Sequence, residues 1–243
     1  MNTFSDSVTT ALHLLIAFDP SLWVIVGRSL AVSATACLIG YGLGVLLGAG
    51  LAVSRFRGRE VVLLGLNTLL ALPSVVVGLV VYLLLSRTGP LGFLGWLFSF
   101  KAMVLAQVVL VLPVVTALTR QVVEDVERQH GEQWASLGAG ALVRSLLLAW
   151  DERLALMTIL VTAFGRAISE VGAVMIVGGN IDGFTRVMTT AIALETSKGD
   201  LPLALALGLV LLAVVGLLNA LVALLRRRSE ARLGTSPALV GGL

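Results

Sequence analysis

Charged residues are scarce in this sequence, and cysteine is almost absent. Only 13% of the 243 residues are Asp, Glu, Lys or Arg, and 58% are hydrophobic, whereas about a quarter of the residues in soluble domains are charged. Mean hydropathy is +1.01. The single cysteine, Cys37, excludes a disulfide within the chain. These scarcities argue against a soluble domain and indicate one bundle of membrane helices.

Catalytic and metal-binding patterns are missing as well. His13 and His130 belong to no His-Glu-x-x-His pattern or other metal-ligand spacing. There is no Gly-x-Ser-x-Gly nucleophile elbow and no Gly-x-x-x-x-Gly-Lys-Ser/Thr phosphate loop. We therefore expect a protein that is not an enzyme and has no cofactor or metal, so that any driving ATP binds another chain.

Basic residues form no single patch, although the isoelectric point is near 9.6. A nucleic-acid binder needs a basic surface patch, but Lys and Arg occur here in short clusters between apolar runs. We therefore expect a lipid bilayer and no nucleic acid as the surroundings of this chain. The first twenty residues contain no Lys or Arg and only a short apolar stretch, so we expect no cleavable signal peptide.

Five apolar runs are candidates to cross a hydrocarbon core of about 30 Å, which takes roughly 20 helical residues. Pro73 lies inside the second run and is expected to kink its helix, because proline donates no backbone hydrogen bond. Before the first run, Asp6–Phe18 has a helical period that predicts a short interfacial helix ending at Asp19–Pro20, with a frayed terminus as the alternative. The expected spans are 22–53, 61–86, 103–119, 154–177 and 201–225.

Small residues recur at every fourth position of the first span. Such a face lets a second helix approach closely, and close packing drives helix association in lipid. We expect this face to be structural, with a role in gating as the alternative. Its members are Ala36, Gly40, Gly44, Gly48 and Ala52.

The distribution of positive charge predicts the orientation, because Lys and Arg accumulate on the cytoplasmic side. Five spans place the two termini on opposite sides. Eleven Lys and Arg residues lie in the first loop, the central loop and the tail, against four in the loops on the other side. The N-terminus is therefore expected outside and the C-terminus in the cytoplasm.

The longest polar interruption is residues 121–149, which we call the knob. Glu124–Ser136 consists of helix-forming residues, Gly138–Gly140 interrupts them, and Ala141–Ala149 is expected to form a second short helix. Trp134 and Leu137 are three residues apart and share a face, which suits an apolar groove on a soluble partner. The alternative is an amphipathic loop lying on the membrane.

The knob resembles the conserved cytoplasmic loop of ABC importer permeases, which reads Glu-Ala-Ala, three residues, then Gly. The spacing from Glu132 to Gly138 is kept, while Gln133 and Trp134 replace the two alanines. The family often has Leu-Pro after this loop, where the present chain has Ala149–Glu152.

Further motifs are similar to those of the molybdate, tungstate and sulfate permeases. The general ones are Leu72–Pro73, Gly89–Gly92, Leu112–Pro113 and Leu137–Ala139. The more specific ones resemble tungstate permease subunits, and they are Phe164–Ala173, Gly178–Ile181 and Thr185–Thr196.

The resemblance implies an all-α integral membrane protein, the type I permease bundle of an ABC importer, in a prokaryotic cell membrane. It further implies a homodimer with two copies of an ATP-binding subunit and one external oxyanion-binding protein. Tungstate is the implied cargo, with molybdate and sulfate as alternatives. The residues implied to contact the ATPase subunit are Glu132, Gln133, Trp134, Leu137, Gly138, Ala139 and Gly140.

Arg166 and Glu170 are four residues apart in the fourth span, which places them on one face of a continuous helix. Charges at membrane depth usually face a bundle interior or a water-filled path. One hypothesis is that this face lines the path of the anion or its gate. The other is that the two residues neutralise each other and lock the packing.

The outer segment, residues 178–200, is too long for a turn and is not apolar throughout. Gly178, Gly179 and Asn180 allow a backbone nest that exposes amide donors to an anion. We expect this segment at the mouth that faces the binding protein, with a solvated re-entrant connector as the alternative. Further donors are Arg186, Thr189 and Thr190.

Two other classes of function compete with an ATP-driven permease. A secondary transporter or channel often contains internal repeats or broken helices in corresponding halves, and no convincing repeat is found in the sequence. A membrane scaffold without transport is the third possibility. An ATPase that co-purifies with the chain would separate a permease from a channel.

Overall fold

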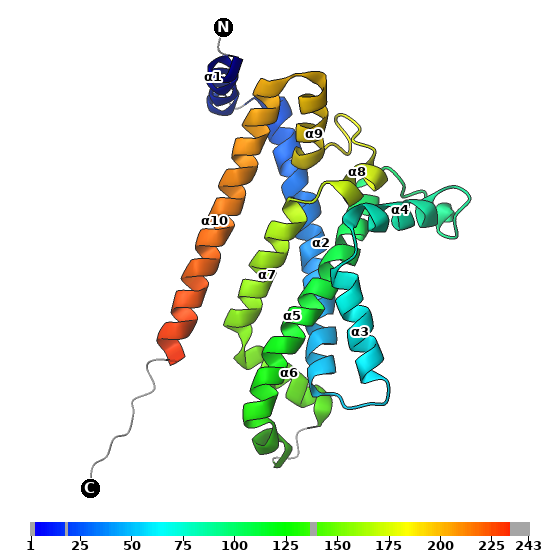
Figure 1. The fold of residues 1–243 in the computed structure, drawn as a ribbon, viewed down its shortest axis with the longest axis vertical. Helices are drawn as coiled ribbons and strands as arrows, with labels where there is room; N and C mark the ends of the chain where they lie inside the picture. The colour runs from blue at the N-terminus through cyan, green and yellow to red at the C-terminus, as the bar shows by residue number, and fades with distance from the viewer. Residues whose placement is uncertain (1–2, 18, 137–139, 234–243) are drawn as a thin grey trace.

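A computed structural model describes residues 3–17, 19–136 and 140–233, and this part of the chain forms helices joined by short turns (Figure 1). The all-helical fold class expected from the sequence is confirmed. The helices are α1 (Thr3–Ile16), α2 (Pro20–Val53), α3 (Arg59–Leu70), α4 (Ser74–Leu85), η1 (Gly92–Leu94), α5 (Phe100–Ser136), α6 (Ala141–Asp151), α7 (Arg153–Ile168), α8 (Gly172–Gly178), α9 (Met188–Lys198) and α10 (Leu201–Leu233).

Three helices are long and apolar enough to cross a membrane, at residues 20–53, 100–129 and 201–224. Two bent pairs, α3 with α4 and α7 with α8, also qualify if each pair is one span, which then gives the five expected spans. Figure 1 shows α2, α5, α7 and α10 following the long axis, with α1 and α9 near one end and α6 at the other.

The start of α2 is set by its capping residue. The Asp19 carboxylate accepts hydrogen bonds from the Ser21 hydroxyl and from the amides of Ser21 and Leu22, the latter two at 2.9 and 3.3 Å. These bonds lower the pKa of Asp19. Pro20 fits the first helical position, where no amide donor is needed. Asp19–Pro20 therefore opens the first span, and α1 ends before it.

The small face of α2 packs directly against α5, as its spacing predicts. A Cβ added at Gly44 would lie 2.7 Å from Val115 Cβ. One added at Gly48 would lie 2.5 Å from the Thr116 carbonyl oxygen. Real Cβ atoms do not approach so closely, so glycine is required for this helix pair to reach its distance.

The kink expected at Pro73 is a complete break in the helix. α3 ends at Leu70, α4 begins at Ser74, and their axes differ by 102°. Pro73 donates no amide hydrogen bond and holds the residue before it out of the helical region. Its carbonyl instead accepts from the amides of Val76 and Val77, at 3.0 and 3.2 Å, and so starts the new helix.

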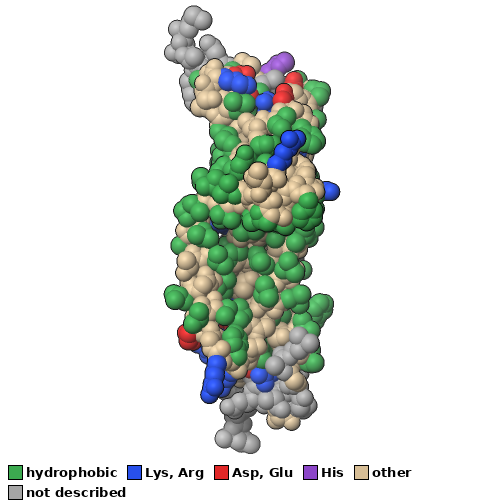
Figure 2. All heavy atoms as spheres, turned by 90° about the vertical axis from the view of Figure 1, so that its right-hand side faces the viewer, with side chains coloured by type: hydrophobic (Ala, Val, Ile, Leu, Met, Phe, Trp, Pro, Cys, Tyr) green, Lys and Arg blue, Asp and Glu red, His purple; other side chains and the backbone are tan. Residues whose placement is uncertain are grey.

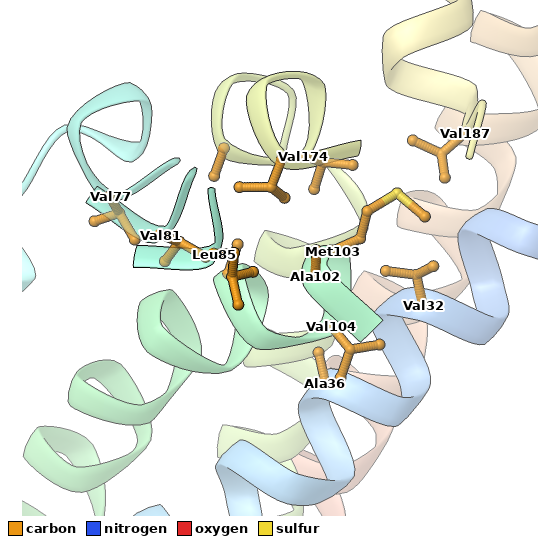
Figure 3. Packing of buried hydrophobic residues seen from close by; sticks show 13 residues of the cluster. Val32, Ala36, Val77, Val81, Leu85, Ala102, Met103, Val104, Val174 and Val187 are labelled. Carbon is orange, nitrogen blue, oxygen red and sulfur yellow. The ribbon is translucent and has the colours of Figure 1, made fainter. Parts of the chain in front are cut away.

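The break turns α4 across α8, where glycines again bring backbones together. A Cβ at Gly78 would lie 2.7 Å from Ala173 Cα. Figure 3 shows that side chains of α4, α8 and α5, Met103 among them, belong to one apolar cluster. This apolar cluster is separate from a second one formed by α2, α5, α6 and α7 nearer the knob.

Gly48→Ala is expected to destabilise the protein, because the added methyl group meets a backbone carbonyl that no side-chain movement can clear. The expected loss is about 1–3 kcal/mol, the usual cost of overpacking. Gly42→Ala is the matched control, since a Cβ there has no neighbour within 4 Å. Thermal unfolding in detergent should show a lower midpoint for Gly48→Ala alone. Equal midpoints would contradict the close packing of α2 on α5.

Candidate functional site

The knob begins as a continuation of α5. The helix does not stop at the expected end of the third span, residue 119, but runs on to Ser136. The second short helix is present as α6, with Gly140 as its N-cap residue. Leu137, Gly138 and Ala139 lie outside the described residues.

The expected partner-contact residues on α5 are in its last two turns. The Gln133 side chain is exposed, while those of Glu132 and Trp134 lie outside the described part of the structure. α6 adds an exposed apolar stripe that sequence reasoning missed: Val143, Leu146, Leu147 and Trp150 are 53%, 47%, 36% and 69% exposed. Their spacing of three and four residues places them on one helix face.

Ion pairs join the knob to α3 and join the two helices of the knob to each other. Glu124 of α5 lies within 3.3 Å of Arg59 from α3 and also pairs with Arg120 on its own helix. Glu127 of α5 lies 3.0 Å from Arg144 of α6. All five side chains are about four-fifths buried. Sequence spacing did not reveal these pairs across helices, because they depend on how α3, α5 and α6 pack.

The first part of the outer segment forms a tight turn. Gly179 and Asn180 have positive φ values of 70° and 49°. A Cβ at Gly179 would also lie 2.8 Å from the Phe98 ring. The Asn180 amide donates to the Thr190 carbonyl oxygen at 3.2 Å, which fixes the turn against α9.

The side chains expected to serve an anion in this segment already contact other residues of the chain, although Arg186 Nε is buried without a hydrogen-bond partner. Arg186 lies 3.2 Å from Asp182 and 3.8 Å from Glu195. The Thr189 hydroxyl donates to the Glu170 carbonyl oxygen at 2.7 Å. The buried Thr190 hydroxyl bonds with the Val187 backbone. These contacts build a folded outer segment rather than a row of free donors.

Two residues of α2 hold the outer segment in place, and sequence reasoning did not assign them this role. The Arg28 guanidinium donates to the carbonyl oxygens of Arg186 and Gly183, at 3.1 and 2.7 Å. The Ser29 hydroxyl accepts from the Met188 amide at 2.6 Å. Arg28 therefore anchors the outer segment to α2.

Arg166 and Glu170 do not share a helix, contrary to expectation. α7 ends at Ile168, α8 starts at Gly172, and the chain bends by 59° between them. The Glu170 carboxylate accepts from the Ala173 amide at 3.2 Å and caps the first turn of α8. Arg166 is exposed and forms no ion pair with any described residue. No ion pair joins Arg166 to Glu170 in this structure, and the hypothesis that they neutralise each other remains a prediction.

The model of the binding-protein-dependent transport system inner membrane component family matches residues 40–234. That range includes both the knob and the outer segment. This chain belongs to that family. The permease is similar to the tungstate uptake system permease protein TupB of Peptoclostridium acidaminophilum, with 43% identity covering 91% of this chain and 97% of the relative.

Two further relatives align with this permease over nearly their full lengths. A probable anion ABC transporter permease protein of Haloferax volcanii is 42% identical over 85% of this chain and 91% of its own. TupB of Campylobacter jejuni is 37% identical over 91% and 93%. Family membership implies an inner-membrane location and partnership with an ATPase and a binding protein.

Arg144→Ala is expected to loosen α6, because it leaves the mostly buried Glu127 carboxylate without its charged partner. A loss of about 1–2 kcal/mol is expected, which is roughly a fivefold to thirtyfold rise in amide hydrogen exchange across α6. Arg128→Ala is the control, since Arg128 is 71% exposed and its partner Glu124 keeps two other arginines. Equal exchange in the two variants would contradict this role for Arg144.

Proposed function

We propose that this permease imports tungstate, driven by ATP that a separate subunit binds and hydrolyses. The observation that carries the proposal is the match to two tungstate permeases over about nine-tenths of the chain. The knob supports it, since a helical projection that continues α5 and is tied by an ion pair to α3 suits contact with a moving partner. Molybdate is the next candidate and sulfate follows.

The proposed assembly is a homodimer of this permease with two ATPase subunits and one external binding protein. Its N-terminus is outside and its knob and C-terminus are in the cytoplasm, following the positive-inside rule. A pocket of about 460 Å³ beside the start of the knob is lined by Arg55, Arg59 and Arg128. Figure 2 shows charged side chains mainly in the upper part and at the lower end of the visible face, with a hydrophobic band between.

The proposed mechanism is alternating access. ATP binding closes the two ATPase subunits and brings the two knobs together, and the paired bundles switch between inward and outward openings. α5 supports this coupling, because one continuous helix of 37 residues joins the knob to the contact with α8 and the outer half. The ion pair between Glu124 of α5 and Arg59 of α3 transmits the movement of the knob to α3. A coupled change needs contacts that differ between the two states, and the knob supplies them.

The first functional test is uptake by the reconstituted complex. Trp134→Asp is expected to lower ATP-dependent uptake at least about tenfold, because a carboxylate at an apolar anchor opposes docking. Gly138→Pro is expected to abolish uptake, while both variants still insert into the membrane. Wild-type uptake by either variant would argue against docking through the knob.

Orientation has its own test. Gln133→Cys in a Cys37→Ala background should react with a membrane-impermeant thiol reagent only from the cytoplasmic side, because Gln133 is exposed on the knob. Reaction from outside would overturn the proposed topology. Calorimetric titration of tungstate, molybdate and sulfate against the cognate binding protein would decide the cargo.

A further inference from the structure

A polar stripe follows one side of α7. Thr162, Arg166 and Ser169 are exposed and Thr158 is half-buried. Spacings of four, four and three residues align them along one face of the helix. The other side of the helix is apolar and buried, through Leu156, Ile159, Ala163 and Ala167.

The stripe lies at membrane depth. Arg166 is 13 residues beyond Arg153 at the knob end of α7, a rise of about 20 Å into a hydrocarbon core of about 30 Å. Apart from Arg28 near the start of the first span, the other expected spans contain no charged residue. A guanidinium facing acyl chains at that depth is costly, so this face is expected to meet water or protein.

The positive charge on the stripe is not neutralised within the described chain. Arg166 forms no ion pair there, and the nearby Glu170 carboxylate caps α8 instead. The face therefore offers a positive potential to whatever passes along it, in a region where low dielectric strengthens electrostatic attraction.

The hydroxyl groups on the stripe are suited to water more than to tight anion binding. Thr158, Thr162 and Ser169 each donate to the carbonyl oxygen four residues back, at 3.1, 2.8 and 3.0 Å. Their oxygens remain able to accept hydrogen bonds from water, while their protons are already engaged. Such a surface keeps a path wet without trapping a dianion, which must leave again for transport to proceed.

We propose that this stripe lines the water-filled path of a tetrahedral oxyanion of charge −2. Arg166 sets the preference for anions, and Thr158, Thr162 and Ser169 keep this wall hydrated. The inference rests on the proposed function and adds to it the surface along which the anion moves.

Cysteine labelling tests whether the face is wet in the full complex. In a Cys37→Ala background, Thr162→Cys should react with a small anionic thiol reagent at least about tenfold faster than Leu217→Cys, because the thiolate forms in water and not in lipid. Leu217 is the matched control, being 72% exposed on the apolar α10. Equal rates would overturn the proposal, since the stripe would then face lipid or be covered by protein.

Uptake in proteoliposomes with the ATPase and binding protein tests the role of the charge. Arg166→Leu should lower tungstate uptake about tenfold or more, whereas Arg166→Lys should stay within about threefold of wild type. Unchanged uptake by Arg166→Leu, or equal losses in both variants, would overturn the role of Arg166. The wild-type complex is the reference: if it fails to transport any oxyanion, the proposed function fails, whereas a transporting wild type with an unreactive Thr162→Cys rejects the path alone.

Discussion

The close contact between α2 and α5 is the constraint on which the rest of the structure depends. Glycines at positions 40, 44 and 48 bring the two helices to a distance that no larger side chain permits. α5 extends to both parts of the molecule. The knob continues it at one end, and nearer its start Met103 lies in the apolar cluster shared with α4 and α8. Buried Gln107 of α5 also donates to the Ala167 carbonyl oxygen at 2.9 Å, where α7 ends.

The two helix breaks divide the bundle into halves that α5 joins. Near the knob, α2, α5, α6 and α7 pack into one apolar cluster that includes Val115, Val123 and Leu156. In the outer half, α4 and α8 turn away from their preceding helices and cross each other at Gly78 and Ala173. Broken helices in lipid require neighbours that satisfy the freed backbone groups. The hydrogen bonds from Gln107 and Thr189 to backbone carbonyls at the second break meet that requirement.

Polar groups are used differently at the ends and in the middle of the bundle. At the knob, Glu124 and Glu127 bind arginines from neighbouring helices. In the outer segment, Arg28, Arg186 and Glu195 are engaged in holding α2 and α9 together. Such contacts between mostly buried groups rigidify the two ends. Arg166 differs from them, because it stands exposed at membrane depth with no ion-pair partner among the described residues. An exposed positive charge without an ion-pair partner among the described residues therefore distinguishes α7 from the two ends of the bundle.

Composition and local pattern determined much of this protein in advance. Apolar runs predicted the long or bent apolar helices, the fourfold recurrence of small residues predicted the packed face of α2, and the glycine-rich sequence before Ala141 predicted the start of α6. All three signals depend on nearby residues alone. Tertiary structure decided the rest. Whether Pro73 kinks or breaks its helix, and whether Arg166 meets Glu170, depends on the crossing of α4 and α8. Arg28, Arg59 and Arg144 likewise find partners 155, 65 and 17 positions away, and such distant pairing follows from packing rather than periodicity.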